Sequence, residues 1–302
     1  MNQKVMSIFT RTPMHVGAGA SVGAVDLPII RERHTGYPVI PGSSLKGVLA
    51  ALWNDEENLT DDKKRIIGSE LENLFGRDDF DSNEDNKKPQ AGKLLVGEAK
   101  ILAFPVRSAK NAFAWCTCPT VIYRLLRDLQ TVTSSCIPNN LKLPTLSAEQ
   151  CLAADALCFA GNSRKIILEE YCLSVVQGQD IDPKLIACLE KMSEDPVWHQ
   201  ELEQRLVILS DEMFSYFVQN ACEVAQHVKI DIDTSAAETG GLFNQVNVPS
   251  ETMFYALMTE TKVKCLDALD KKLKANNQIL QIGADATTGL GWCTVELITE
   301  KQ

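Results

Sequence analysis

The sequence predicts an α+β fold, because strand-like and helical segments both recur along its 302 residues. Residues 4–12, KVMSIFTRT, alternate apolar and polar side chains as a half-buried strand does. Residues 43–52 instead place their leucines and valine on one face of a helix. The glycine-rich segments have neither the GxxxxGK[ST] spacing nor the strand-to-helix context of a dinucleotide-binding unit. Nucleotide-binding α/β folds are therefore disfavoured.

Further strands are expected where short apolar and β-branched runs lie between turn residues. They cover residues 93–105, 112–118, 164–175, 205–209, 224–233 and 254–264, and the runs ILQI and CTVELI near the C-terminus. Helices are expected where apolar spacing follows Pro or Ser, or precedes Gly. They cover residues 61–76, 119–128, 183–192, 196–204, 210–220 and, as a basic amphipathic helix, 264–277. The segment 139–160 is expected to be a loop with one short strand.

The segment from Thr234 to Glu251 lies between two expected strands and contains Gly240-Gly241. This arrangement suggests a projecting β-hairpin with its tip in the segment, although an ordinary surface hairpin fits the same pattern. Residues 78–89, DDFDSNEDNKKP, are highly charged and suggest a surface loop. They lack the DxDxDG order of a calcium loop.

Composition indicates a folded, soluble protein, since 45% of residues are hydrophobic and 23% are charged. A cytoplasmic location is expected by default. No apolar run approaches the roughly 20 residues that cross a bilayer, and the N-terminus lacks a secretory apolar segment. The ten cysteines lie mostly in apolar segments and are expected to be reduced and buried. Cys116 and Cys118 form a CxC, expected on one face of a strand, without a second pair at zinc-finger spacing.

The net charge of −10 argues against a surface that binds nucleic acid everywhere. The first 50 residues, however, carry a charge of about +3, whereas the acids concentrate between Asp55 and Asp85. One basic face on an acidic body is therefore possible.

The segment from His15 to Leu49 contains more candidate functional residues than any other part of the sequence. Gly17, Gly19 and Gly23 would let the backbone approach a ligand closely, or would simply form a turn. Asp26 stands alone in an apolar run, so it is either a cap or a working group. A basic cluster and a helix start follow, with Ser43 or Ser44 expected as N-cap next to an anion site. Their residues are Arg31, Arg33, His34, Ser43, Ser44 and Lys46.

A second glycine-rich loop, QIGADATTGLGW, lies between the last two expected strands, at residues 281–292. Its backbone amides and threonine hydroxyls could bind phosphate oxygens, although a plain hairpin connection fits equally well. If the two glycine-rich segments meet in space, they would form one surface suited to a sugar-phosphate backbone.

HVGAG, VDLPIIRERHTGYPVIPGSSLKG and IGADATTGLGW together resemble the backbone subunits of type III-B CRISPR (Cmr) effector complexes, in the RAMP superfamily. The resemblance covers both ends of the chain, and ETGGLF with PSETMFYALM is similar in kind. It implies a single RAMP domain over residues 1–302, with a modified RRM-like (ferredoxin-like) core. Helical insertions are expected near residues 54–92 and 130–200, and a projecting thumb hairpin near 234–252.

The same resemblance implies that copies of the chain stack as a filament along guide CRISPR RNA and cleave paired target RNA at regular intervals. The implied partners are guide RNA, target RNA, further copies, other RAMP subunits, a small helical subunit and a large polymerase-like subunit, with no membrane. Asp26 matches the family's catalytic aspartate and would be a ligand of Mg²⁺ or Mn²⁺. His15 matches a loop histidine that would contact phosphate, act as general acid or be structural.

The expected RNA-binding residues are His15, Gly17, Gly19, Arg31, Arg33, Ser43, Ser44, Lys46, Gly283, Thr287, Thr288 and Gly289. Glu238 and Phe243 would lie on the thumb near the cut. One alternative is a purely architectural RNA-binding subunit, with catalysis elsewhere in the complex. A stand-alone guide-processing endonuclease is disfavoured, because such enzymes need an acid and a base, and the second histidine near His15 is His34.

Overall fold

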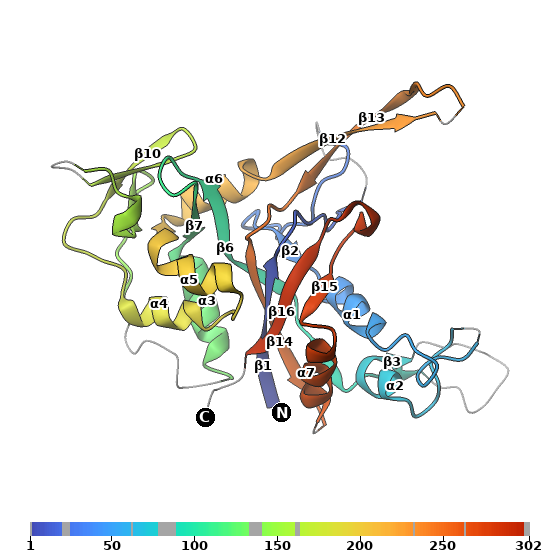
Figure 1. The fold of residues 1–302 in the computed structure, drawn as a ribbon. Coiled ribbons are helices and arrows are strands. Elements are labelled where there is room, and N and C mark those ends of the chain that lie inside the picture. Colours follow the sequence, from blue (N-terminus) through green and yellow to red (C-terminus); the bar gives the residue numbers. More distant parts are fainter. Residues whose placement is uncertain are drawn as a thin grey trace.

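A twelve-stranded mixed sheet runs through the molecule and carries helices around it (Figure 1). The computed structural model describes residues 2–19, 25–61, 63–77, 89–132, 141–160, 164–231, 233–262 and 264–298. The charged segment 78–88, Gly23 and residues 139–140 lie outside the described residues. The observed mixture of strands and helices confirms the expected α+β class.

Four antiparallel strands form the inner half of the sheet. Their order is β16 (Trp292–Ile298), β1 (Asn2–Thr10), β14 (Met253–Glu260) and β6 (Ala99–Arg107). The centre of β1 is fully buried between its neighbours, because it carries consecutive apolar side chains such as Val5 and Met6. Helix α1 (Gly42–Ala51) connects β1 towards β6, and α7 (Cys265–Ala275) connects β14 to β16. Short strand β15 (Ile279–Gln281) extends this half beyond β16.

The outer half of the sheet begins within β6, whose last residues pair with β7 (Phe113–Thr117) instead of β14. The sheet continues through β11 (Leu206–Leu209), β8 (Gln150–Ala153), β10 (Tyr171–Val175) and β9 (Lys165–Leu168). Four helices accompany it, on the left in Figure 1. They are α3 (Pro119–Leu129), α4 (Pro183–Glu190), α5 (Pro196–Arg205) and α6 (Asp211–Asn220). A short 3-10 helix, η1 (Asp155–Leu157), follows β8.

Aromatic side chains join the two halves into one hydrophobic cluster. Trp198 of α5 packs with ring centroids 5.8 Å from Phe9 of β1 and 5.0 Å from Trp115 of β7. Each indole nitrogen has an acceptor, since Trp198 donates to the carbonyl of Leu189 and Trp115 to that of Glu251. No helix among the described residues has both the length and the apolar character to cross a membrane.

The expected helix over residues 61–76 is wrong in its first half. Helix α2 covers Glu70–Phe75 only, with Ser69 as the N-cap that accepts a hydrogen bond from the amide of Glu72. Gly68 has a φ of +82°, which no α-helix contains, so the helix cannot begin earlier. Gly76 follows as the expected C-cap and opens β3 (Gly76–Arg77), which pairs with β4 (Gln90–Ala91).

Two expected strands are each divided in the structure. Residues 93–105 form β5 (Leu94–Val96) and β6, separated at Gly97, where a Cβ atom would lie 2.6 Å from the carbonyl oxygen of Leu257. β2 (Val39–Ile40) pairs with β6 on this side. Residues 164–175 form β9 and β10 around Glu169, whose φ is +50°.

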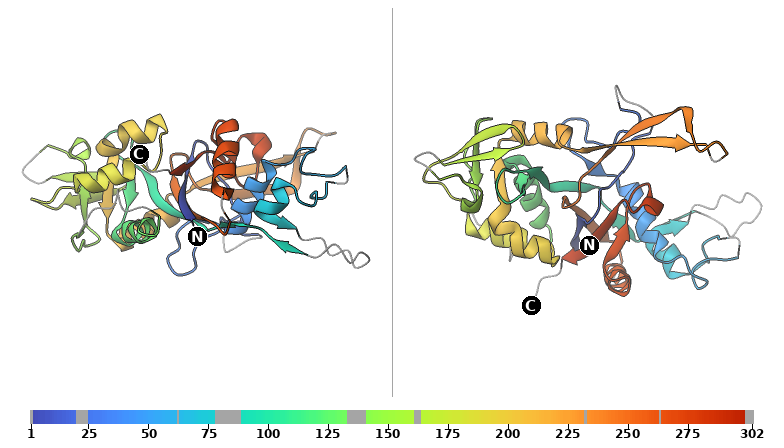
Figure 2. Two further views of the ribbon diagram at one scale, coloured as in Figure 1. Left: turned by 90° about the horizontal axis from the view of Figure 1, so that it is seen from below. Right: turned by 45° about the horizontal axis from the view of Figure 1, so that its top comes forward.

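The expected pairing of the projecting hairpin is also wrong. Strand β12 (Glu223–Ile230) pairs not with β14 but with β13 (Ala237–Asn247), a strand within the segment expected to form the tip. The strand at residues 253–260 is instead the buried neighbour of β1. The β12–β13 hairpin extends away from the body of the molecule in Figure 1 and in the right view of Figure 2. A projecting hairpin is therefore present, with its turn near Asp231.

Candidate RNA-facing site

The two glycine-rich segments meet in the structure. The amide of Ala284 donates to the carbonyl of His15 over 2.9 Å, and the amide of Gly291 donates to the carbonyl of Pro13 over 2.8 Å. Gly283 has a φ of +94°, and a Cβ atom there would collide with the carbonyl of His15. Only glycine permits both this conformation and this approach. The expectation that the segments lie side by side is confirmed.

Strand β13 is the element that joins these segments, and it was not expected from the sequence. Its residue Val246 accepts a hydrogen bond from Nδ1 of His15 over 2.8 Å. Because a carbonyl oxygen can only accept, Nδ1 carries the proton, and Nε2 of the neutral ring carries none. His15 is 5% exposed, and a Cβ atom on Gly17 would lie 2.9 Å from its Nε2. These contacts favour a structural role for His15 over that of a general acid.

Asp26 is exposed and forms two reciprocal hydrogen bonds with Asn244 of β13. The backbone amide of Asp26 donates to the side-chain oxygen Oδ1 of Asn244 over 2.9 Å. The backbone amide of Asn244 donates to the carboxylate oxygen Oδ2 of Asp26, also over 2.9 Å. Among the residues that the structure describes, the second carboxylate oxygen of Asp26 has no hydrogen-bonding partner. Asp26 is therefore a held but accessible carboxylate.

The segment around Asp26 is also fastened through its backbone. Leu27 donates to the carbonyl of Asn244 over 3.1 Å and accepts from the amide of Val246 over 3.0 Å. The chain at Leu27 thus runs as a parallel bridge along the edge of β13 opposite to β12.

Gln245, the residue between these anchors, holds the second glycine-rich loop. Its amide Nε2 donates to Oδ2 of Asp285 over 2.8 Å and to Oδ1 of Asn247 over 3.0 Å. Gln245 is 3% exposed, so its buried amide group forms these hydrogen bonds within the protein and does not face solvent. Three consecutive residues of β13 therefore hold the segments of Asp26, Asp285 and His15. A weak signal for this strand is present in LFNQVNV, where Leu242, Val246 and Val248 lie at even spacing, as on one face of a strand.

Arg31, expected to contact RNA, is engaged within the protein. Its Nη1 donates to the carbonyls of Val218 and Gly36 over 2.7 Å and 2.9 Å, and its Nη2 donates to Sγ of Cys222 over 3.2 Å. Val218 lies in the last turn of α6, where carbonyl groups lack helical partners and attract cations. Arg31 therefore clamps its loop to α6. Arg33 is exposed.

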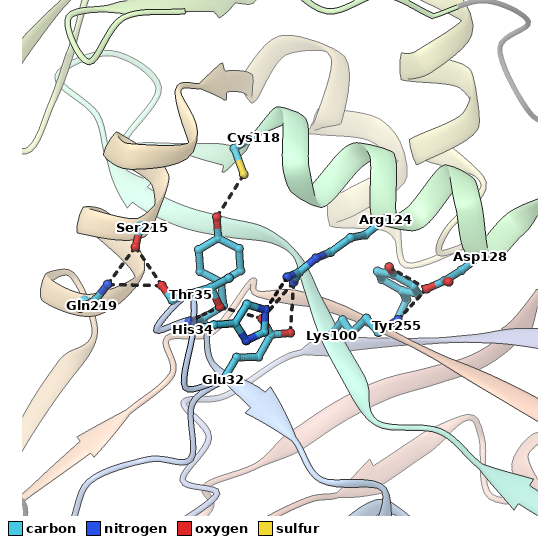
Figure 3. A network of polar contacts seen from close by, with 11 residues as sticks. Glu32, His34, Thr35, Lys100, Cys118, Arg124, Asp128, Ser215, Gln219 and Tyr255 are labelled. Atoms are coloured by element: carbon cyan, nitrogen blue, oxygen red, sulfur yellow. Dashed lines mark hydrogen bonds and ion pairs between the residues drawn. The ribbon is translucent and has the colours of Figure 1, made fainter.

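A polar network fastens the rest of this loop to α3 and, at a second point, to α6 (Figure 3). Arg124 of α3 donates to both carboxylate oxygens of Glu32, over 2.9 Å and 3.1 Å, and to Nε2 of His34 over 3.0 Å. The carbonyl of Thr35 accepts from the hydroxyl of Ser215 in α6 over 2.9 Å. His34 thus accepts a hydrogen bond from Arg124 and helps to attach the loop to α3.

The start of α1 corrects one expectation. The N-cap is Pro41, without a side-chain cap, and Ser43 and Ser44 lie inside the first turn. The helix begins at Gly42, where a Cβ atom would collide with the chain at Val96 and Gly97, so this position requires glycine. Both serines are exposed and Lys46 is half-buried.

The other expected contacts lie in two places. Gly17 and Gly19 are exposed, and so are Thr287 and Thr288 of η2 (Ala286–Thr288), which Gly289 ends with a φ of +88°. The hydroxyl of Thr288 donates to the carbonyl of Asp285 over 2.9 Å. The last two expected residues, Glu238 and Phe243, lie on the β12–β13 hairpin.

On the hairpin, Glu238 lies 3.6 Å from Nζ of Lys229, and Phe243 stacks on His227 with ring centroids 5.2 Å apart. Phe243 precedes Asn244 directly, whereas Glu238 is near the turn. The hairpin therefore carries an aromatic pair beside the Asp26 site and an ion pair at its outer part.

The nine cysteines within the described residues are free thiols, and six of them are buried. Burial raises the pKa of the Cys118 and Cys151 thiols to about 12, which keeps them protonated. One expectation is wrong, since Cys172 is exposed because β10 alternates its faces. Cys118 lies directly beyond β7, in extended backbone, as the N-cap of α3.

Comparison with known proteins finds relatives along almost the whole chain. A family model described as the RAMP superfamily matches residues 8–294. A Pyrococcus furiosus protein named CRISPR system Cmr endoribonuclease Cmr4 is 35% identical over 305 residues, covering 98% of this chain and 96% of that protein. The crystal structure of oligomeric Cmr4 from the same organism matches with a TM-score of 0.70 and 27% identity, over 100% of both chains. A cryo-EM structure of Type III-B Cmr-beta bound to cognate target RNA matches in fold, with a TM-score of 0.71 and 20% identity over 99% of this chain and 98% of that one.

Proposed function

Because the chain belongs to the RAMP superfamily, we propose that it is a backbone subunit of a type III-B CRISPR effector complex. In this role it binds guide RNA, stacks with further copies of itself and cleaves complementary target RNA at regular intervals. The observation that carries the proposal is the 35% identity over 98% of the chain to a protein named as a Cmr endoribonuclease. Other RAMP subunits, a small helical subunit and a large polymerase-like subunit complete the proposed assembly.

The proposed fold is a single RAMP domain with an RRM-like core and a thumb. The strand order β16–β1–β14–β6, with α1 between the first and second strands of the core and α7 between the third and fourth, supports an RRM-like βαββαβ arrangement. The joint hydrophobic cluster supports one domain. The β12–β13 hairpin is the proposed thumb, which shifts its bounds to Glu223–Asn247 from the 234–252 expected.

The proposed RNA-facing surface consists of the two joined glycine-rich segments, the start of α1 and the base of the hairpin. Exposed backbone at Gly17 and Gly19, and exposed side chains of Ser43, Ser44 and Thr287, support contacts to phosphate oxygens. Arg33 and Lys46 supply positive charge that a phosphate backbone attracts. His15, Arg31, Gly283, Thr288 and Gly289 support this surface by holding its backbone in place.

Asp26 is the proposed catalytic residue. In a splayed target nucleotide, the 2′-hydroxyl attacks the adjacent phosphorus, the bond to the 5′-oxygen breaks, and the hydroxyl proton leaves. The carboxylate of Asp26 is held through Oδ2, which accepts from the amide of Asn244. Its other oxygen can accept the hydroxyl proton or orient the hydroxyl group. The 5′-oxygen takes a proton from water, since the contacts of His15 favour a structural role.

Mg²⁺ or Mn²⁺ remains the proposed cofactor. In the described part of the chain, no three His, Cys, Asp or Glu side chains gather into a metal site. A single accessible carboxylate fits a loosely held ion, because Mg²⁺ in nucleotide-processing sites is bound through one or two carboxylates together with substrate phosphates. Asp26 would hold such an ion, which would stabilise negative charge on the phosphate.

The test is cleavage of a matching target RNA by the assembled complex carrying Asp26→Asn, with every other nuclease subunit inactivated. The asparagine removes the charge but keeps a side-chain oxygen that can accept from the amide of Asn244. We expect evenly spaced products from the parent complex and none from the variant, with equal guide and target binding. Even spacing retained by Asp26→Asn would instead favour the purely architectural function.

A further inference from the structure

The reciprocal hydrogen bonds between Asp26 and Asn244 distinguish this aspartate from an ordinary exposed side chain. One bond, from the backbone of Asn244 to Oδ2, fixes the carboxylate, and any residue except proline could supply it. The other bond uses the side-chain Oδ1 of Asn244 to accept the backbone amide of Asp26. That second bond depends on the residue type at position 244.

Asn244 is well placed to hold this bond because its strand is fixed on both sides of it. Gln245 and Val246 bind Asp285 and His15, while β12 pairs along the other edge of β13. Phe243, on its N-terminal side, stacks on His227 of β12. The base of the hairpin is therefore a well-supported element, whereas the segment that carries Asp26 is attached to it through the single bridge at Leu27.

We propose that Asn244 is a positioning residue, which sets the place of the Asp26 carboxylate relative to RNA by binding the amide of Asp26. This inference rests on the proposed function, and it adds that the hairpin base forms part of the cleavage site. Asn244 itself does not contact the reacting atoms. It acts by restricting the loop, so that the free carboxylate oxygen stays in one position.

The loss of the side-chain bond has a defined consequence. Asn244→Ala leaves the amide of Asp26 without its acceptor, while the bonds of Leu27 to β13 remain. The loop keeps its general path but the carboxylate gains freedom. Because misplacement of a reacting group by about 1 Å can cost on the order of a hundredfold in rate, we expect cleavage to slow by roughly ten- to a hundredfold.

Gln226 provides a matched control. It lies directly opposite Asn244 in the β12–β13 register, so both side chains share one face of the hairpin. Asp26 has its hydrogen bonds to Asn244, however, and not to Gln226. Gln226→Ala therefore truncates a side chain on the same face of the hairpin, directly across from Asn244, but leaves the hydrogen bond between Asn244 and the amide of Asp26 in place.

The experiment compares single-turnover cleavage by complexes assembled with Asn244→Ala or Gln226→Ala, with the complex in saturating excess over the target RNA. We expect slow cleavage only with Asn244→Ala, and equal guide binding and assembly with both. Equal rates from the two variants would overturn the positioning role. The proposed function fails separately, if Asp26→Asn retains evenly spaced cleavage.

A second measurement follows the hydrogen bond itself. In the full chain labelled with ¹⁵N-aspartate, hydrogen exchange of the Asp26 amide reports whether its acceptor is present. We expect faster exchange in Asn244→Ala, and retained protection in Gln226→Ala and in Asn244→Asp, which keeps an acceptor oxygen. Unchanged exchange in Asn244→Ala, or loss of protection in Asn244→Asp, would contradict the proposal.

Discussion

The contact of Gly283 with His15 allows a quantitative test of how the two glycine-rich segments meet. Gly283→Ala places a methyl group against the carbonyl of His15, whose carbon atom lies 2.9 Å from the Cβ position. The obstructing atoms belong to backbone that is itself bonded to Ala284 and, through the imidazole, to Val246. The methyl group cannot be accommodated by rotation of a side chain, so the segments must separate.

The magnitude follows from two contributions. A non-glycine residue at positive φ costs about 1–3 kcal/mol. Separation of the segments removes the hydrogen bond from Ala284 to His15, worth about 1 kcal/mol. Gly289→Ala is the control, because Gly289 has a similar φ of +88° but no atom within 4 Å of its Cβ position. The difference in stability between the two variants therefore measures the second contribution, the lost hydrogen bond.

The assay is equilibrium unfolding of the two variants and the parent chain by urea. We expect both variants to be destabilised, with Gly283→Ala less stable than Gly289→Ala by about 1 kcal/mol, since the cost of positive φ is common to both. Equal free energies of unfolding would refute the close approach of the C-terminal loop to His15.

Two further predictions concern stability. Arg31→Ala should lower the free energy of unfolding by about 2 kcal/mol, because it removes charged hydrogen bonds to the carbonyls of Gly36 and Val218. The control is Arg33→Ala, at an exposed position, whose free energy of unfolding should stay within about 0.5 kcal/mol of that of the parent. If urea unfolding shows Arg33→Ala to be the less stable of the two variants, Arg31 does not hold its loop against α6. Burial, and then the charge of Asp195, raises the pKa of Glu251 from 4.5 to about 7, against the opposing effect of Arg11. The folded state therefore binds more protons between these values, and stability should fall as pH rises from 4.5 to about 7. Glu251→Gln cannot ionise and should be less affected by pH than the parent over this window. An equal decline in both proteins would contradict this origin.

The elements that the sequence predicted well have strong local signals. Ser210 caps α6 as expected, with its hydroxyl oxygen accepting from the amide of Met213. Proline at the first position correctly marked α3, α4 and α5. The strands β1 and β11 were likewise predicted, although β1 is buried on both faces and not half-buried as its alternation suggested.

The errors arise where distant contacts decide the structure. Strand β13 begins with Ala237 and contains Gly240-Gly241, and up to Asn244 its residues other than Gly241 are exposed or half-buried, so its first part has the pattern of a loop. Its pairing with β12 could not be distinguished from that of β14, which is the stronger apolar strand. The missed strand explains why Asn244 and Gln245 were not recognised beside Asp26.

Arg31 shows the same limit at the level of one side chain. Its place in a basic cluster predicted contact with RNA, yet the carbonyl of Val218, 187 residues away along the chain, accepts from its guanidinium group. Asp26 was identified from its isolation in an apolar run and from family resemblance. Its attachment to the hairpin required the structure.

The most direct test of the account is a structure of the complete effector complex with guide RNA and a non-cleavable target RNA. We predict that the free carboxylate oxygen of Asp26 lies within direct or single-water hydrogen-bonding distance of the target strand at each cut position. RNA that passes along the opposite side of β13, with no target nucleotide near Asp26, would contradict it.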